Sequence, residues 1–512
     1  MCGILFSNLK KTSERGFRDA LNLMNHRGPD FTGYFSFYGY YLGHNRLKII
    51  DLNDRSNQPM TSQCGRYEIV FNGEIYNYVE LRGRLQVEPV TNGDTEILLE
   101  LYAEHGPDCL QWLNGMFAFI IFDKIEHSVF AARDRTGVKP LYFHTSGDTV
   151  AFASEISPIL QLTGISSHDP IGVRQYLKLR SFFNGRTIYE GISMFPAGHY
   201  WLDGRLHKYW SCPIHQDTPP TDEELEALIN DAVKLRLRSD VPVGAYLSGG
   251  LDSSILVSLA GRPLNTWSVG FEDSNEFYWA DLVARHFDCD HKNISVTRNQ
   301  FVEDLEWMVK KRKEPLSVPN EVLLYQLNFL VREKNKVCLS GEGADELFFG
   351  YDRIFKWANQ SVRFDLNEFS NMYSYGSHSD IEIVEDALSP FLYLKTPIKI
   401  VSQFFQQAHL HGLLRRLDSS SMLNSVEARV PFCDHHPLIE RISGVSFDYL
   451  HENGLSKAPL KKIFRKLLPC SILERKKVGF PVPIESMPFR KKVIGTAMDS
   501  WLKFNMFILE GN

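Results

Sequence analysis

Between residues 242 and 339, short apolar runs alternate with stretches whose spacing is helical. The apolar runs cover 243–247, 266–271, 293–296 and 336–339, and the helical stretches lie near 253–260, 278–288, 299–311 and 321–334. Parallel strands need a long crossover, usually a helix, so this order predicts βαβ units and a parallel sheet. Ligands bind such sheets beyond the carboxyl ends of the strands. From about residue 350 onward we expect a mostly helical part.

The first 210 residues differ, with short β-rich runs separated by glycine-containing turns. We expect strands at 67–71, 116–122, 129–132, 141–143 and 150–152, and helices near 16–24 and 95–104. This pattern favours an α/β sandwich. A polar, proline-bearing stretch ends at Pro220, and Thr221-Asp-Glu-Glu224 then forms a capping box before a helical apolar pattern. The chain therefore divides into a domain over 2–210, a linker over 211–220 and a domain over 221–512.

Composition narrows the function class. The formal net charge of -6 and the absence of a basic tract argue against nucleic acid as a partner. No apolar run approaches the roughly 20 residues that cross a bilayer, and no signal peptide is recognisable, so we expect no membrane association and a cytoplasmic location. The eight cysteines show no zinc or redox spacing, which indicates reduced and partly buried thiols. Only Cys2 invites a catalytic interpretation.

Cys2 directly follows the initiator Met, so removal of Met1 places an α-amine beside the thiol. An α-amine has an ordinary pKa of about 7.7–8.0 and can serve as the general base of its own nucleophile. That arrangement suits acyl transfer from an amide. A second-position cysteine alone would more often be an ordinary small residue.

Residues suited to binding glutamine follow Cys2. Arg46 offers a cation for the glutamine carboxylate, and Asp94 an anion for its ammonium. The Asn72 amide and the Gly73 N–H offer donors for an oxyanion. Taken singly, Asn72-Gly73 reads equally well as a hairpin turn, Arg46 as a surface charge and Asp94 as a helix cap. Their joint presence favours a glutaminase, with Glu74 as a further contact.

The loop Ser248-Gly-Gly-Leu-Asp-Ser-Ser254 follows an apolar run and opens a helical stretch. Its glycines allow backbone N–H groups to face an anion at the helix N-terminus, and its hydroxyl groups add donors. It lacks the G-x-x-x-x-G-K-[ST] pattern of kinase-type phosphate loops. The loop is typical of enzymes that split ATP into AMP and pyrophosphate, although a bare Ser-Gly-Gly can also form a tight turn.

A second loop, Ser340-Gly-Glu-Gly-Ala-Asp-Glu346, follows the run at 336–339. Magnesium prefers hard oxygen ligands, so Asp345 with Asp252 forms the candidate Mg2+ site. Glu342 is the candidate for proton transfer as ammonia attacks. An acidic helix start would explain Asp345 and Glu346 but not the Ser-Gly-Glu-Gly segment that precedes them.

The N-terminal motifs together resemble the class II glutamine amidotransferases. The matching stretches are Cys2-Gly-Ile4, His26-Arg-Gly-Pro29, Arg46-Leu-Lys-Ile-Ile-Asp51, Asn72-Gly-Glu-Ile-Tyr-Asn77, Gly115-Met-Phe-Ala-Phe119, the run from Ala132 to Tyr142, and Ser154-Glu155. The resemblance implies an N-terminal-nucleophile αββα sandwich. It also implies catalysis by Cys2, Asn72 and Gly73, and glutamine contacts by Arg46, Leu47, Ile49, Asn72, Glu74 and Asp94.

Over about residues 2–500, the chain resembles the glutamine-dependent asparagine synthetases. Ser421-Met422, Glu427-Ala-Arg-Val-Pro-Phe432 and Asp434-His435 also match. The resemblance implies an ATP-pyrophosphatase domain of the PP-loop, HUP-like type, an internal ammonia channel, a homodimer, and catalysis by Glu342 and Lys477. It further implies ATP contacts by Leu247, Ser248, Gly249, Gly250, Asp252, Ser253, Ser254, Val269, Ser340, Gly341, Lys457 and Lys477.

The expected reaction transfers glutamine nitrogen to a carboxylate activated by ATP, with aspartate as the first candidate acceptor. Two departures from the family pattern leave other acids open: Lys313 stands where many members have Asp, and Ser419 where arginine is common. A hexuronic acid of a surface polysaccharide and a natural-product acid are the alternatives.

Three other protein classes fit less well. A nucleotide-binding regulatory pseudoenzyme would not need the set of Cys2, Arg46, Asn72 and Asp94. A β-lactam-forming synthetase dispenses with the nucleophile. Phosphoribosyl and hexosamine amidotransferases share only the first domain.

Overall fold

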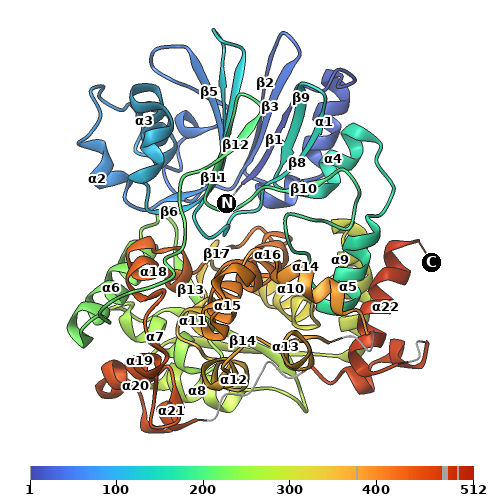
Figure 1. Cartoon of the computed structure of the whole chain (residues 1–512). Helices are drawn as coiled ribbons and strands as arrows, with labels where there is room; N and C mark the ends of the chain where they lie inside the picture. Colours follow the sequence, from blue (N-terminus) through green and yellow to red (C-terminus); the bar gives the residue numbers. More distant parts are fainter. Residues whose placement is uncertain (1, 376–378, 476–481, 493–494, 512) are drawn as a thin grey trace.

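The computed structural model describes residues 2–375, 379–475, 482–492 and 495–511, with the side chains of 491 and 492 left out. Two stacked parts form the molecule, and the N-terminal end of the chain lies where they meet (Figure 1). Among the described residues, no helix is long and apolar enough to cross a membrane.

The N-terminal part contains two six-stranded antiparallel sheets. The first has the order β10-β8-β9-β1-β3-β2 and the second the order β12-β11-β7-β6-β5-β4. The bounds are β1 Gly3–Ser7, β2 Phe31–Phe37, β3 Tyr40–Arg46, β4 Met60–Thr61, β5 Tyr67–Ile75, β6 Gly115–Asp123, β7 Ser128–Arg133, β8 Tyr142–Ser146, β9 Thr149–Ala153, β10 Ser193–Met194, β11 His199–Leu202 and β12 Arg205–Lys208.

Alternating side chains join these sheets to each other and to the helices. In β1, Ile4 and Phe6 enter the core between the sheets, whereas Leu5 points to the opposite face, toward α1 (Glu14–Asn22) and α4 (Ile156–Thr163). The second sheet uses β6 in the same way and packs its outer face on α3 (Asp94–His105). The result is the αββα sandwich that the sequence predicted. Helices α2 (Tyr78–Arg82) and α5 (Pro170–Leu179) complete this part.

The C-terminal part contains a five-stranded sheet of order β15-β14-β13-β16-β17, and every neighbouring pair is parallel. The predicted parallel sheet is therefore confirmed. The bounds are β13 Val243–Tyr246, β14 Asn265–Phe271, β15 Asp290–Val296, β16 Val337–Leu339 and β17 Glu427–Arg429. Strand β17 was not expected, because it lies in the segment predicted to be mostly helical. The order reverses between β13 and β16, so the loops after these two strands meet at the switch point.

Helices surround this sheet. Thr221 caps α6, since its side chain accepts a hydrogen bond from the Glu224 N–H at 3.2 Å. The helices are α6 Asp222–Arg236, α7 Leu251–Leu259, α8 Phe277–His286, α9 Arg298–Arg312, α10 Asn320–Val331, α11 Ala344–Leu347, α12 Asp352–Gln360, α13 Leu366–Tyr373, α14 Ile381–Leu388, α15 Pro397–Gln403, α16 Leu410–Met422, α17 Pro431–Asp434, α18 His436–Ile442, α19 Phe447–Leu450, α20 Ala458–Ile463, α21 Cys470–Glu474 and α22 Ala497–Leu509, and the short hairpin β18 His451–Glu452 and β19 Leu455–Ser456 lies between α19 and α20.

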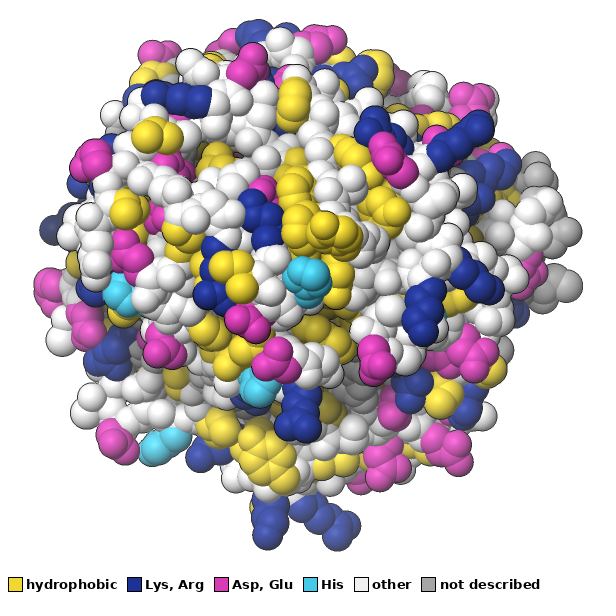
Figure 2. All heavy atoms as spheres, turned by 90° about the horizontal axis from the view of Figure 1, so that it is seen from above, with side chains coloured by type: hydrophobic (Ala, Val, Ile, Leu, Met, Phe, Trp, Pro, Cys, Tyr) yellow, Lys and Arg dark blue, Asp and Glu magenta, His cyan; other side chains and the backbone are white. Residues whose placement is uncertain are grey.

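Polar contacts connect the two parts. The Asp51 N–H donates to Asp240 Oδ2 at 2.8 Å, and Thr136 Oγ1 donates to the Cys433 carbonyl at 2.7 Å. Arg27 forms a buried ion pair with Asp418 of α16. On the face seen from above, acidic and basic side chains are interspersed (Figure 2).

Candidate active site

Cys2 immediately precedes β1, and its side chain is buried. The Cys2 backbone nitrogen donates to Asn72 Oδ1 at 2.9 Å, while the Cys2 carbonyl accepts a hydrogen bond from Arg27 Nε at 3.0 Å. Once Met1 is removed, this nitrogen is the α-amine. Asn72 is therefore placed to hold the amine, and Arg27 to hold the carbonyl of the same residue.

Asn72 and Gly73 lie in β5 opposite Ala118 and Phe117 of β6. Gly73 has φ +155°, and an added Cβ would lie 2.1 Å from the Met116 carbonyl oxygen, so no side chain fits there. Asn72 Nδ2 is buried and has no hydrogen-bond partner among the described residues. A buried donor without a partner is costly, which makes this N–H group available to an oxygen of a bound substrate.

Opposing influences act on the Cys2 thiol. Burial raises the pKa of the Cys2 thiol, while the Leu47 N–H and the positive charge of Arg46 lower it. The net direction is upward, so the thiol is the stable form in this environment. A general base is therefore needed for attack, and the adjacent amine is the group in place for it.

Arg46 ends β3 and turns its guanidinium toward the loop at 50–57. Nη1 donates to the Asn53 carbonyl at 2.9 Å and to Asn57 Oδ1 at 2.8 Å, and Nη2 donates to the Asp51 carbonyl at 2.5 Å. A two-pronged contact with a glutamine carboxylate would require these bonds to be exchanged. The buried Leu47 and Ile49 follow Arg46.

Asp94 begins α3 and accepts a hydrogen bond from the Ile75 N–H at 2.9 Å. Burial raises the pKa of the Asp94 carboxyl to about 6. Burial, with the nearby charges of Glu427 and Asp94, also raises the pKa of Glu74. The Glu74 carboxylate lies 3.7 Å from Arg429 of β17, so the C-terminal part supplies a cation to this acidic corner.

The loop 247–250 runs between β13 and α7, as expected for a phosphate-binding loop. Gly249 has φ +67°, and an added Cβ would lie 2.3 Å from the Trp279 carbonyl carbon of α8. Glycine is therefore required by both conformation and close packing. Gly250 is the N-cap residue of α7, which places the N–H groups of that helix start at the loop.

The hydroxyl groups of this loop bond within it. Ser254 Oγ donates to the Gly250 carbonyl at 2.7 Å, and Ser248 Oγ lies 3.3 Å from Ser253 Oγ. Leu247, at the start of the loop, and Val269, on β14, are both buried. Both residues are the ones for which the resemblance implies adenine contacts, which stay a prediction.

Asp252 and Asp345 lie in the first turns of α7 and α11, the helices that follow the two loops at the switch point, and they converge on one ammonium group. Lys457 Nζ lies 2.7 Å from both Asp252 oxygens and 2.6 Å from Asp345 Oδ1. Two carboxylates that close around one small cation fit Mg2+, which takes one or two carboxylates and fills its sphere with phosphates and water. No group of three or more His, Cys, Asp or Glu side chains suited to a metal occurs in the part of the chain that the structure describes.

The second loop carries Ser340, Gly341 and Glu342 beside the first. An added Cβ at Gly341 would lie 2.9 Å from the Asp252 Cβ, so the two loops are in direct contact. The Ser340 N–H donates to the Arg429 carbonyl at 2.8 Å. Glu342 Oε1 accepts a hydrogen bond from Arg416 Nη2 of α16 at 2.8 Å.

Two arginine contacts, one at the loop 247–250 and one at Cys2, were not anticipated from the sequence. Arg475 Nη1 donates to the Gly249 carbonyl at 3.0 Å, and its guanidinium lies 4.8 Å from the Trp279 ring centre. Arg27 is the other, and only its place in the His26-Arg-Gly-Pro29 motif hinted at a role. Lys477, expected as a catalytic and phosphate-binding residue, lies outside the described residues.

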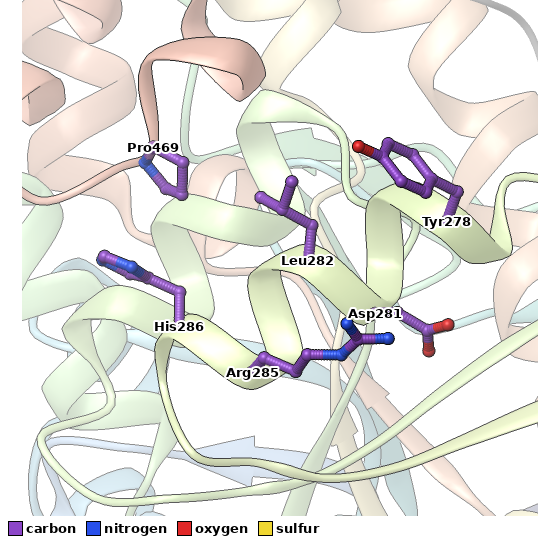
Figure 3. A pocket seen from close by; sticks show the side chains of 6 residues that line it. All are labelled: Tyr278, Asp281, Leu282, Arg285, His286 and Pro469. Carbon is purple, nitrogen blue, oxygen red and sulfur yellow. The ribbon is translucent and has the colours of Figure 1, made fainter.

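A surface pocket of about 490 Å³ lies away from these loops. Figure 3 shows its lining, which comes from one side of α8 and from Pro469. None of the expected site residues takes part in it, so its size does not identify the chemical site. The residues are Tyr278, Asp281, Leu282, Arg285, His286 and Pro469.

Comparison with known proteins agrees with both halves of this geometry. The family of glutamine amidotransferase domains matches residues 1–210, and the asparagine synthase family matches residues 224–503. Glutamine-hydrolyzing asparagine synthetase 1 of Bacillus subtilis (strain 168) is 31% identical, with 90% of this chain and 82% of the relative covered. A putative glutamine-hydrolyzing asparagine synthetase 2 of Methanocaldococcus jannaschii is 33% identical over 78% of this chain and 90% of its own. Asparagine synthetase B of Escherichia coli (strain K12) is 28% identical, with 90% of this chain and 77% of the relative covered.

Proposed function

The chain belongs to the glutamine-hydrolysing asparagine synthetase family, and on this premise we propose that it converts aspartate to asparagine with glutamine and ATP. Glutamate, AMP and pyrophosphate are the other products. The observation that carries the proposal is the pairing of two loops at one switch point, with Asp252 and Asp345 around a single cation position. Residues 2–210 form the glutaminase domain of this proposal, 211–220 the linker and 221–512 the synthetase domain.

In the first step, the Cys2 amine takes the thiol proton and the thiolate attacks the glutamine amide carbon. The developing oxyanion accepts hydrogen bonds from Asn72 Nδ2 and the Gly73 N–H. Asp94 holds the ammonium of glutamine, and the Arg46 charge attracts its carboxylate, with Leu47, Ile49 and Glu74 as further contacts. Ammonia leaves, and water then releases glutamate from Cys2.

In the second step, the aspartate side-chain carboxylate attacks the α-phosphorus of ATP, and pyrophosphate leaves. The loop 248–254 holds the phosphates through its N–H groups and hydroxyls, beside Ser340 and Gly341. Lys457 and Lys477 add positive charge, and Leu247 and Val269 contact the adenine. Ammonia then displaces AMP from the acyl-adenylate, while Glu342 accepts a proton.

Asp252 and Asp345 would hold Mg2+ in this scheme, and the ion would neutralise charge on the ATP phosphates. Lys457 would then move from the carboxylates to the phosphates.

Ammonia would reach the second site inside the protein, since free ammonia is protonated in water and lost. Supporting this idea, the N-terminal end of the chain lies where the two parts meet (Figure 1), and the Cys2 carbonyl accepts a hydrogen bond from Arg27, which pairs with Asp418 of the synthetase part.

The structure weakens one of the two reasons for considering an acceptor other than aspartate. Lys313 is exposed in the left-handed C-cap of α9, at φ 58°, whereas the next residue, Glu314, is buried and paired with Arg415. A charge at 313 therefore points to solvent. Ser419 of α16 remains a reason to test other acids, such as a hexuronic acid or a natural-product acid.

Acceptor-dependent pyrophosphate release tests the proposal. Purified protein with ATP, Mg2+ and glutamine should release pyrophosphate when aspartate is added, and asparagine should form in equal amount. Glucuronic acid and glutamate serve as alternative acceptors of matched concentration. Pyrophosphate release with another acid but not with aspartate would overturn the aspartate assignment and keep the reaction class.

A further inference from the structure

Arg27 occupies a buried junction between the two parts, and its side chain is only 1% exposed. Its three guanidinium nitrogens have three different acceptors. Nε donates to the Cys2 carbonyl at 3.0 Å, Nη1 to Glu155 at 3.3 Å, and Nη2 to Asp418 at 2.9 Å. One planar group thus joins the nucleophile to Asp418, a residue that lies 391 positions after Arg27 in the sequence.

Asp418 is the only one of these acceptors that comes from the synthetase part. Its side chain is 3% exposed, and its other oxygen lies 3.6 Å from Lys139 Nζ. Burial lowers the pKa of Arg27, but the charges of Asp418 and Glu155 raise it more, so the guanidinium remains charged. The charged guanidinium makes one hydrogen bond to each of three acceptors, and together these bonds fix the orientation of its plane as well as its position.

We propose that Asp418 is a positioning residue of the glutaminase, acting through Arg27 on the Cys2 carbonyl. This inference rests on the proposed function. Asn72 holds the Cys2 nitrogen, so Arg27 fixes the opposite end of the same residue, and Asp418 fixes Arg27. Without Asp418, the guanidinium keeps only its bonds to Glu155 and to the Cys2 carbonyl, so its plane can tilt and the Cys2 thiol loses its fixed direction of attack.

Helix α16 makes this arrangement more than a local contact. Arg416, two residues before Asp418, donates to Glu342 in the ATP-site loop. Residues two apart on a helix do not share a face, so one side chain reaches the synthetase loop and the other reaches the glutaminase. The orientation of Cys2 therefore depends on α16, the same helix whose Arg416 bonds to Glu342.

The test is Asp418→Asn, assayed for glutamine hydrolysis without ATP or acceptor. We expect kcat to fall about 10- to 100-fold, because small misplacements of a reacting group have effects of this size, while KM for glutamine is unchanged. Ammonium-dependent amidation should fall less than hydrolysis. The matched control is Asp434→Asn, which removes the charge of an equally buried Asp–Arg pair, Arg236 to Asp434 at 2.7 Å; among the described residues Asp434 shares no hydrogen bond with Arg27 or Asp418.

A double-mutant cycle separates positioning from general destabilisation. Arg27→Lys keeps the charge but loses the fork, so Asp418→Asn should add no further loss in that background. Asp434→Asn should act independently of Arg27→Lys. If Asp418→Asn does not fold, Asp418→Glu, which keeps the charge but shifts the carboxylate, should show the same loss of kcat.

Additive losses in the cycle, or a wild-type kcat in Asp418→Asn, would overturn this inference but leave the proposed function standing. A wild-type protein that hydrolyses no glutamine would instead overturn the proposed function, and this inference with it.

Discussion

Asp345 Oδ1 lies 2.6 Å from Lys457 Nζ, and the same ammonium group contacts both oxygens of Asp252. The two carboxylates lie in the first turns of α11 and α7, the helices that follow β16 and β13, and these two strands are neighbours in the sheet. Burial opposes the charge of Lys457, but the two carboxylates together raise its pKa. A single cation thus holds together the two loops that carry the ATP chemistry.

Chelation should separate the two half-reactions. Excess EDTA is expected to abolish ATP-dependent pyrophosphate release, because the phosphates lose their divalent counter-ion. Glutamine hydrolysis should continue, since the residues around Cys2 require no metal. Parallel assays of glutamate and pyrophosphate check this, and equal loss of both activities would contradict the assignment.

Lys457→Met should lower stability and increase the response to magnesium. Removing one partner of a buried ion pair costs about 3–5 kcal/mol, here because two carboxylates lose their counter-charge. Mg2+ without ATP should therefore raise the melting temperature of Lys457→Met more than that of the wild type. Lys462→Met, which removes an exposed lysine paired with Asp222, is the control. An equal Mg2+ response in all three proteins would show that the two aspartates do not bind the ion.

Asn72→Ala should lower kcat for glutamine hydrolysis about 10²- to 10³-fold, the usual effect of losing one oxyanion donor. Asn72 Nδ2 has no other partner among the described residues, whereas Oδ1 accepts the hydrogen bond of the Cys2 nitrogen, so the variant removes the oxyanion donor and this acceptor together. Ammonium-dependent amidation should be retained. A variant with normal kcat and raised KM would assign Asn72 to substrate binding instead.

Glutamine binding should weaken in acid because of Asp94. Burial raises the pKa of Asp94 to about 6, so the carboxyl becomes neutral below that pH and no longer attracts the glutamine ammonium. KM for glutamine is expected to rise about tenfold for each pH unit below 6. In Asp94→Asn, KM should be high and no longer follow this titration. A KM that stays flat in the wild type between pH 5 and 7 would contradict the role.

The raised pKa of Asp94 also determines how this residue makes the stability of the fold depend on pH. A raised pKa means that the folded state binds the Asp94 proton more tightly than the unfolded chain does. The contribution of Asp94 to stability is therefore lost as pH rises through about 6. Asp94→Asn should remove this component from a series of urea unfolding curves measured between pH 4 and 7.

Strands and helices with a clear period were predictable from the sequence. The run at 116–122 became β6 (Gly115–Asp123), because alternate residues face the two cores, and the capping box at Thr221 marked the start of α6. Strand β17 was missed. It has three residues, and its Glu427 and Arg429 pair with each other in a buried setting that composition does not reveal.

Site residues within one motif were also predictable, whereas contacts across the interface were not. Asn72 could be placed beside Cys2 by resemblance, but no local pattern links Arg27 to Asp418. The bonding of Arg46 to the 50–57 loop was equally hidden, since it depends on how that loop turns back. Long-range pairing of charged residues is a property of the packed chain.

The central claim is that nitrogen released at Cys2 reaches a carboxylate activated by ATP. Isotope transfer from [amide-15N]glutamine, in the presence of excess unlabelled ammonium, ATP, Mg2+ and aspartate, tests it most directly. We predict that mass spectrometry will find 15N in the side-chain amide of asparagine, with one AMP formed for each amide, and that Cys2→Ala will form only unlabelled asparagine. Label confined to free ammonia, or ATP cleaved to ADP, would contradict the account.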